Sequence, residues 1–501
     1  NGQGKPIDNS YNKILAHFKK IQCLEESYEL LCWDQETMMP KNGSYARAEQ
    51  LATLEEFIHN LKTDKRIPNW IEGVQSYRKP SKIQMANLYE ISKIYNNASK
   101  VPKKLSIELA KTTALAQEAW AKARNKNKPE DLIPSLKKII QLKRSEADCL
   151  RESNQDRYEA LLQKFEPHQS NSNLKTILKS LREPLRELRE KILSKKDSTK
   201  EIKGRFNRNA QIKISKAIAK DLCFNFDSGR LDESLHPFSS GHRTDARITT
   251  RVDQSNPLSC ISSVMHEVGH ALYEQGIPET LYGQPIGTWC SMGFHESQSR
   301  LIENQIGRSY AFCEYLFPIM KRYFPNLDLS NSEELYRATN NVCPNYIRVD
   351  SDEVNYNLHI LLRYELEEEL ISEKLEVEQL EEEWNSRFYK DFDLKIKKSN
   401  QGFLQDIHWS SGLFGYFPTY SLGNLYAASL FKKMVKEIEN LEEDIKTGQF
   451  KEIVNWLRKK IHNKGRTVTP TELIKYATGV PVSTEPFLEY LNLKFAKIYG
   501  L

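Results

Sequence analysis

The spacing of apolar residues along the chain predicts a mainly helical protein. Apolar positions recur at intervals of three and four over long stretches such as 14–33 and 358–380, which is the period of an amphipathic helix. Strict alternation is rare. The segment 246–252 alternates and is rich in β-branched side chains, so we expect it to be a strand. The pattern predicts a mainly α fold in two helical lobes with a small β-sheet.

The length of 501 residues would allow two or more domains. However, the sequence contains no Pro/Gly/Ser-rich linker, low-complexity run or internal repeat. We therefore predict a single domain over 1–501. Its helical N-terminal part covers about 1–200, and its second part, about 201–501, contains the motifs described below.

The charge pattern gives little indication of a nucleic-acid partner. The net charge of +6 comes from 73 basic and 67 acidic residues, which is a small excess for this length. Short basic clusters are typical of solvated helix faces. The acidic segment 365–383 has leucines at helical spacing and is interpreted as an exposed structural helix.

Two further features concern the cellular setting. No stretch of 18 or more apolar residues is present, so no transmembrane helix and no membrane partner is predicted. The eight cysteines form no C-x-x-C pair, which favours free thiols in a reducing, cytoplasmic compartment.

The segment His266-Glu267-Val268-Gly269-His270 is an H-E-x-x-H (HEXXH) motif. On a helix, residues i and i+4 share a face, so both imidazoles could bind one metal ion. Glu267 could then reach a water molecule at the metal without being a ligand. The surrounding residues are apolar, and polar side chains in a buried helix need partners, which a metal would supply. Gly269 weakens a helix, and close approach of another backbone or of substrate would explain it.

A catalytic zinc ion usually has three protein ligands. Glu296, in the segment 295–298, is the best third ligand, because a helical pattern follows it. Alternatively, Glu296 is a carboxylate favoured by a helix N-terminus. His295 is a rival ligand or a group that supports a ligand. Adjacent helical residues point about 100° apart, so at most one of the two binds the metal.

These segments together resemble the thermostable carboxypeptidase Taq family, the M32 metallocarboxypeptidases. The family's D-x-R-x-T motif is matched by 245–249, its I-R-x-x-A-D motif by 347–352 and its G-x-x-Q-D-x-H-W motif by 402–409. The one departure is Ser351, which stands where the family has Ala. The segments 33–40 and 415–420 also look like segments of this family, so the matches run from about residue 33 to about residue 424 and cover nearly the whole chain. The resemblance implies a zincin-type metallopeptidase with a long substrate groove between helical lobes, and a homodimer.

The resemblance also implies a zinc-dependent carboxypeptidase. Such an enzyme releases single amino acids from peptides with a free C-terminus, by attack of metal-activated water. We expect His266, His270 and Glu296 to hold Zn²⁺, although Co²⁺ and Mn²⁺ accept the same ligands. Glu267 is the expected general base.

Arginine suits recognition of a terminal carboxylate, because its planar fork donates two parallel hydrogen bonds. Arg348 and Arg247 are the candidates, and for each the alternative is an ion pair with an aspartate nearby in sequence. His408 and Tyr420 are the expected donors to the oxyanion of the transition state, unless they belong to an aromatic core. Asp406 is a weaker candidate, for orienting a metal-binding histidine.

Two other functions remain open on the sequence alone. An endo-acting oligopeptidase would use the same zinc chemistry in a groove open at both ends. A catalytically silent helical scaffold would keep the fold without the reaction, although the intact H-E-x-x-H motif argues against it.

Overall fold

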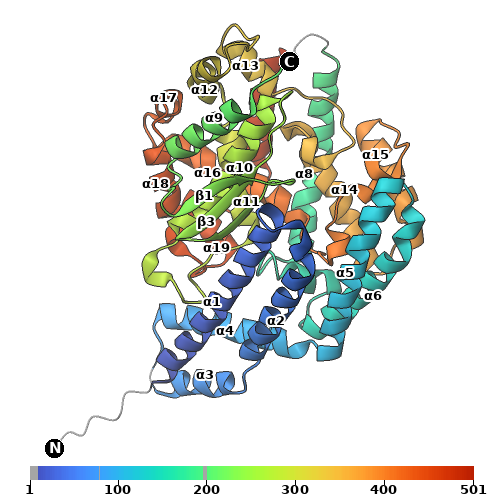
Figure 1. The fold of residues 1–501 in the computed structure, drawn as a ribbon, viewed down its shortest axis with the longest axis vertical. Helices are drawn as coiled ribbons and strands as arrows, with labels where there is room; N and C mark the ends of the chain where they lie inside the picture. The colour runs from blue at the N-terminus through green and yellow to red at the C-terminus, as the bar shows by residue number, and fades with distance from the viewer. Residues whose placement is uncertain (1–8, 78, 196–199) are drawn as a thin grey trace, which may run out of the picture.

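The computed structural model describes residues 9–77, 79–195 and 200–501 (Figure 1). The helices of the first part are α1 (Ser10–Thr37), α2 (Ser44–Lys62), α3 (Arg66–Tyr77), α4 (Lys82–Lys100), α5 (Lys103–Lys126), α6 (Ile133–Leu150), α7 (Arg157–Leu162) and α8 (Asn171–Leu193). Those of the second part are α9 (Arg208–Asp221), α10 (Pro257–Gly276), α11 (Met292–Arg300), α12 (Tyr310–Tyr323), α13 (Ser332–Thr339), α14 (Glu353–Ile371), α15 (Leu380–Phe392), α16 (Pro418–Glu437), α17 (Leu441–Lys446), α18 (Lys451–Lys460), α19 (Pro470–Thr478) and α20 (Glu485–Tyr499).

The predicted mainly helical fold is confirmed, and α1 contains the whole of the 14–33 pattern. The 358–380 pattern, in contrast, is divided between two helices. Helix α14 ends at Ile371, and Glu373 adopts a left-handed conformation with φ 66°. The Lys374 N–H returns to the Glu369 carbonyl over 2.9 Å, which satisfies the helix end.

The prediction that 365–383 is an exposed helix was wrong for its first part. Helix α14 packs against α8 and α16 and is buried on most sides, with Glu367 completely inaccessible. In this part of the helix, Glu365, Glu368 and Glu369 pair with cationic side chains of other helices. For example, Glu365 pairs with Arg182 at 2.6 Å. An acidic pattern that is typical of a solvated helix face therefore occurs here on a helix that packs against its neighbours, because cationic side chains compensate the charges.

A three-stranded sheet contains β1 (Gly229–Glu233), β2 (Ser239–His242) and β3 (Asp245–Thr250) in the order β1-β3-β2. The predicted strand is β3, which pairs parallel with β1 and antiparallel with β2. Alternate residues of β3 face α10, where the hydroxyls of Thr250 and Ser263 are 2.7 Å apart. The small sheet therefore supports the helix that carries the H-E-x-x-H motif.

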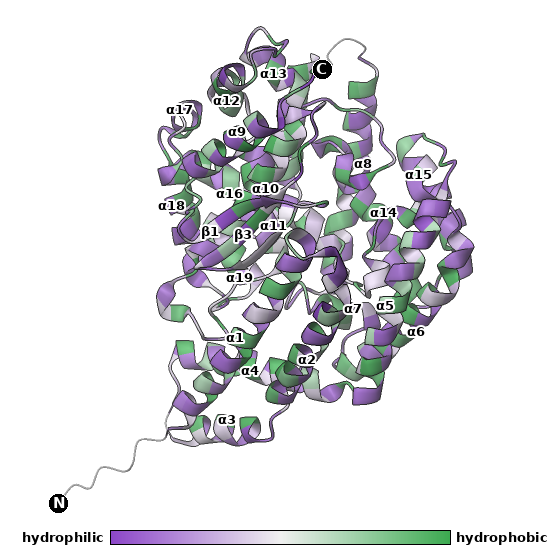
Figure 2. Cartoon of the chain, viewed as in Figure 1, coloured by the Kyte–Doolittle hydropathy of each residue, from purple (hydrophilic) through white to green (hydrophobic). Residues whose placement is uncertain are grey.

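The buried apolar side chains form two clusters. The larger one extends from Ala116 to Tyr499. The smaller one lies among α1 to α4, the blue helices at the bottom of Figure 1, and consists of Ile14, Phe18, Ile21, Ile58, Ile67 and Ile91. Figure 2 shows hydrophobic and hydrophilic residues interspersed around the helices, as amphipathic helices require.

The single-domain organisation stays a prediction.

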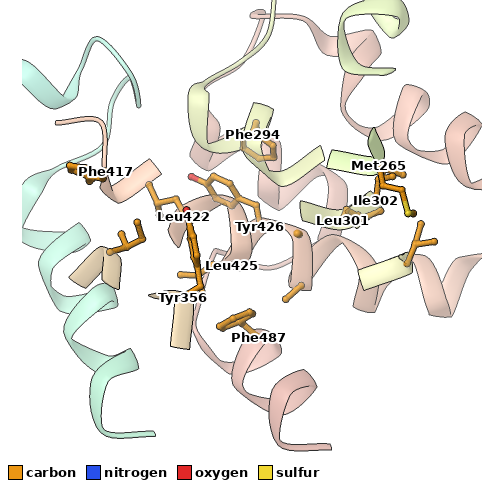
Figure 3. Packing of buried hydrophobic residues seen from close by; sticks show 14 of the residues in the cluster. Met265, Phe294, Leu301, Ile302, Tyr356, Phe417, Leu422, Leu425, Tyr426 and Phe487 are labelled. Carbon is orange, nitrogen blue, oxygen red and sulfur yellow. The ribbon is translucent and has the colours of Figure 1, made fainter. Parts of the chain in front are cut away.

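Helix α11 lies in the larger cluster, packed against α10 and α16 (Figure 3). The rings of Phe294 and Tyr426 stack with centroids 4.3 Å apart. Two glycines make the close approach possible. A Cβ atom on Gly269 would lie 2.4 Å from the Gln298 carbonyl oxygen, and one on Gly423 would lie 2.7 Å from the Glu296 Cβ. The predicted close backbone approach at Gly269 is confirmed.

None of the helices within the described ranges combines the length and the apolar character that crossing a membrane requires.

The substitution Gly269→Ala should destabilise the fold by about 1–3 kcal/mol, because the added methyl group overlaps the backbone of α11. Chemical denaturation measures the change. Gly43→Ala is a matched control, since its added Cβ would meet only the flexible Met39 side chain. A Gly269→Ala variant as stable as the control variant would contradict the close-packing argument.

Candidate metal centre and active site

The two histidines of the H-E-x-x-H motif and Glu296 come together in the structure. Helix α10 presents His266 and His270, and α11 presents Glu296. The His266 and His270 Nε2 atoms lie 3.7 and 3.5 Å from the two carboxylate oxygens of Glu296. All three potential ligand atoms lie within 4.8 Å of one another. This is the grouping that the sequence predicts.

Neighbouring side chains fix the direction of both imidazoles. The His266 Nδ1 is 2.7 Å from Glu303, and its N–H donates to that carboxylate. The His270 Nδ1 is 2.6 Å from the Nδ1 of His295, whose Nε2–H donates to Glu274 over 2.9 Å. His295 therefore accepts from His270, and the Nε2 atoms of both motif histidines are left for a metal.

The sequence leaves two roles open for His295, that of a ligand and that of a group that supports a ligand. Its position fits the second role. Sequence analysis missed Glu274 and Glu303, although a signal for each exists. Glu274 follows His270 by four residues, and Glu303 follows Glu296 by seven, so helical spacing places each on the same helix face as a candidate ligand. Glu303 belongs to η4 (Leu301–Ile306), a π-helical turn of a kind often found at functional sites.

Helix α11 begins earlier than the sequence pattern indicates. It starts at Met292, where the Ser291 hydroxyl accepts from the Phe294 N–H. Glu296 is therefore in the second turn of the helix rather than at its N-terminus, which weakens the helix-dipole explanation for this carboxylate.

The site is rich in negative charge. Burial lowers the pKa of His266, but the Glu296 and Glu303 carboxylates more than offset it and raise this pKa to about 9. Burial lowers the pKa of His270 to about 4. A proton on His266 thus compensates the carboxylates, and a metal cation would compensate them in its place. Two imidazole nitrogens and a carboxylate oxygen are also the donor set of many catalytic zinc sites.

Glu267 lies beside these ligands on α10 with 6% of its surface exposed. Burial raises the pKa of its carboxyl group to about 7, although the positive charge of His266 opposes the shift. A carboxyl group with such a pKa is suited to accept and return a proton near neutral pH.

His408 and Tyr420 form a hydrogen-bonded pair, with the His408 Nε2 3.0 Å from the Tyr420 Oη. Burial lowers the pKa of His408 to about 3, so its imidazole is neutral. Burial and the nearby Tyr416 raise the pKa of Tyr420 well above its ordinary value, and the negative charge of Glu296 also contributes. Tyr420 is therefore a protonated hydroxyl near Glu296, one of the three candidate metal ligands.

Arg348 is held in a buried charge cluster. Its Nη2 donates to Asp406 over 2.9 Å and its Nη1 donates to the Tyr356 hydroxyl over 3.1 Å. The second oxygen of Asp406 accepts from the Arg363 Nε at 2.7 Å. Asp406 thus orients two arginines and not a metal-binding histidine, which corrects the sequence-based interpretation. Two arginines and one aspartate leave a net positive charge.

The two candidate arginines differ in their surroundings. Arg348 is joined to the metal ligands through Tyr356, because the Arg300 guanidinium lies 4.3 Å from the Tyr356 ring centroid and its Nε donates to Glu296 over 2.8 Å. Arg247 instead lines a cleft of about 310 Å³ beside α1. Within the described residues its guanidinium contacts Asp245 and the Trp33 ring, and none of the three metal-ligand candidates.

Known proteins resemble this chain over almost its full length. The family model described as carboxypeptidase Taq (M32) metallopeptidase matches residues 13–495. Thermostable carboxypeptidase 1 of Thermus thermophilus is 36% identical over 505 residues, with 98% of this chain and 99% of the relative covered. Carboxypeptidase 1 of Bacillus subtilis is 33% identical over 489 residues, with 96% and 97% covered.

Solved structures agree with these relatives. The crystal structure of the M32 carboxypeptidase from Deinococcus radiodurans R1 is 31% identical with a TM-score of 0.95, and the alignment covers 99% of this chain and 100% of that one. Metallocarboxypeptidase 1 of Trypanosoma cruzi is 33% identical with a TM-score of 0.94, covering 97% and 99%. The chain therefore belongs to the carboxypeptidase Taq (M32) metallopeptidase family and is a metal-dependent carboxypeptidase.

Proposed function

We propose that His266, His270 and Glu296 bind the catalytic metal ion and that this ion is Zn²⁺. The support is the donor set of two imidazole nitrogens and one carboxylate, with both Nδ1 atoms engaged by neighbouring groups. Co²⁺ and Mn²⁺ are the alternatives that the same ligands accept. A bound divalent ion would activate a water molecule and polarise the scissile carbonyl.

Glu267 acts as the general base in this proposal. It is adjacent to His266 and has a pKa of about 7, so it accepts a proton from the attacking water and passes it to the leaving amine. Tyr420 donates to the oxyanion that develops on the carbonyl oxygen. His408 holds the Tyr420 hydroxyl in place through the bond between them.

Arg348 recognises the terminal carboxylate of the peptide. The observation that carries this assignment is the buried, net positive cluster of Arg348, Arg363 and Asp406, which a substrate carboxylate would neutralise. Arg247 then belongs to the adjoining part of the substrate path. In this proposal the substrate path ends at the cluster and admits only a chain terminus, which separates a carboxypeptidase from an oligopeptidase.

The proposed setting is a homodimer in the cytoplasm. All eight cysteines are free thiols, as a reducing compartment favours.

Removal of the metal with a chelator should abolish peptide hydrolysis, because the remaining residues have no group that activates water as strongly. One equivalent of Zn²⁺ per chain should restore it, as followed by release of free amino acid and by elemental analysis. His270→Ala should lower metal affinity by at least about tenfold. Full activity in a metal-free preparation would contradict the proposal.

The variant Glu267→Gln should keep its metal but lose about 10²–10⁴-fold in kcat, since the amide cannot accept the proton. Steady-state kinetics and metal content are measured on the same sample. The control is Glu274→Gln, which leaves the proton acceptor intact and should affect metal affinity more than kcat. Wild-type kcat in metal-loaded Glu267→Gln would refute the base assignment.

The variant Arg348→Met should lower kcat/KM for free-acid peptides by at least about tenfold, because the terminal carboxylate loses a charged partner. C-terminal amides of the same peptides should be poor substrates of both enzymes. Arg247→Met, which removes an arginine from the 310 Å³ cleft, is the matched variant and should show a smaller loss in kcat/KM. The reverse order of effects would transfer the carboxylate-binding role to Arg247.

A further inference from the structure

A buried carboxylate lies behind the loop that carries His408. Glu367 of α14 is completely inaccessible to solvent and accepts three hydrogen bonds. Its Oε1 accepts from the Tyr158 hydroxyl at 2.8 Å and from the Gly415 backbone N–H, and its Oε2 accepts from the Trp409 Nε1 at 2.8 Å. Every donor comes from a different element, so Glu367 joins parts of the chain that are far apart in sequence.

Helix α14 holds the chain on both sides of His408. Two residues before it, Asp406 is bonded to Arg363. One residue after it, Trp409 is bonded to Glu367. Arg363 and Glu367 are four residues apart and thus on one face of α14. A single rigid helix therefore determines where His408 sits.

Glu367 also fixes the far end of the same loop. Gly415 has φ 90°, and a Cβ atom there would lie 2.9 Å from the backbone nitrogen of Leu162. The loop is thus enclosed between α7 and the Glu367 carboxylate. The next residue is Tyr416, whose ring centroid lies 5.6 Å from that of His408. Movement of Gly415 would move the aromatic wall beside His408.

We propose that Glu367 is a positioning residue for peptide hydrolysis, holding Trp409 and Gly415 so that His408 and Tyr420 face the scissile carbonyl. The inference rests on the proposed role of His408 and Tyr420. Glu367 touches neither substrate nor metal in this account. Its effect is transmitted through the loop from 409 to 415.

The isosteric variant Glu367→Gln tests the proposal. The carboxylate accepts on both oxygens, whereas the amide accepts on one and donates on the other, so one N–H of the loop loses its acceptor in either orientation. We expect kcat to fall by about tenfold or more, with KM changed less than about threefold and metal content unchanged. Glu368→Gln is the matched control, because its carboxylate faces Asn171 and Lys175 and not the loop.

A second substitution separates positioning from general loss of structure. In Glu367→Gln, the amide oxygen satisfies two donors if it faces Tyr158 and Gly415, which leaves the amide NH₂ against the Trp409 N–H. Trp409→Phe removes that N–H. The double variant should therefore recover part of the kcat lost in Glu367→Gln, and a double-mutant cycle should be strongly non-additive. If the fold losses in kcat of the two single variants simply multiply in the double variant, the proposal is overturned.

Hydrogen exchange of the 409–417 peptide distinguishes failure of this inference from failure of the proposed function. Faster exchange there in Glu367→Gln, with α10 unchanged and kcat reduced, supports the inference. Unchanged exchange would overturn it, because the loop would not depend on Glu367. Faster exchange with wild-type kcat would overturn the catalytic role of His408 and Tyr420, and the positioning role with it.

Discussion

The close packing of α11 against α10 is the constraint on which the rest of the site depends. The two motif histidines are on one helix and Glu296, the proposed third ligand, is on the other, so the distance between the helix axes decides whether the three candidate ligand atoms meet. Gly269 lets the backbone of α11 approach to a distance that no other residue would allow. The metal site is thus a consequence of packing as much as of the motif itself.

Charge compensation is the second organising feature. Glu296, a proposed metal ligand, is held by Arg300, whose guanidinium lies over Tyr356. Tyr356 in turn accepts from Arg348, which Asp406 anchors. Within this set of contacts each charged side chain has a partner of opposite sign, and the arginine cluster keeps one positive charge in excess. Helix α14 contributes Tyr356 and Arg363 to this network, and these contacts explain part of why so polar a helix is buried.

Local sequence patterns predicted the features that depend on local spacing. The helical fold, the β3 strand and the meeting of His266 and His270 follow from periodicity, because residues i and i+4 share a helix face. Glu296 is expected as the third ligand from the helical pattern that follows it and from the family resemblance, because local spacing does not bring it to the histidines. The buried state of α14 could not be predicted, since Glu367 looks like part of a solvated acidic run. Its partners Tyr158 and Trp409 are brought to it only by the tertiary fold.

The roles of Asp406 and of the residues behind the histidines show the same limit. The sequence suggests that Asp406 orients a metal-binding histidine, whereas in the structure its two oxygens accept from the arginines of η5 (Arg348–Asp350) and α14. Glu303 and Glu274 sit at helical spacing from ligands, but spacing alone does not reveal which of many glutamates faces inward. Neither the expected single-domain organisation nor the proposed homodimer has a local sequence signal.

X-ray absorption at the zinc edge of the reconstituted enzyme tests the central claim most directly. Two imidazoles and one carboxylate should give only nitrogen and oxygen neighbours at about 2.0–2.2 Å, with multiple scattering from two histidine rings. Loss of one imidazole contribution in His270→Ala would agree with the account. A sulfur neighbour at about 2.3 Å, or a spectrum that His270→Ala leaves unchanged, would contradict it, because the metal would then lie elsewhere.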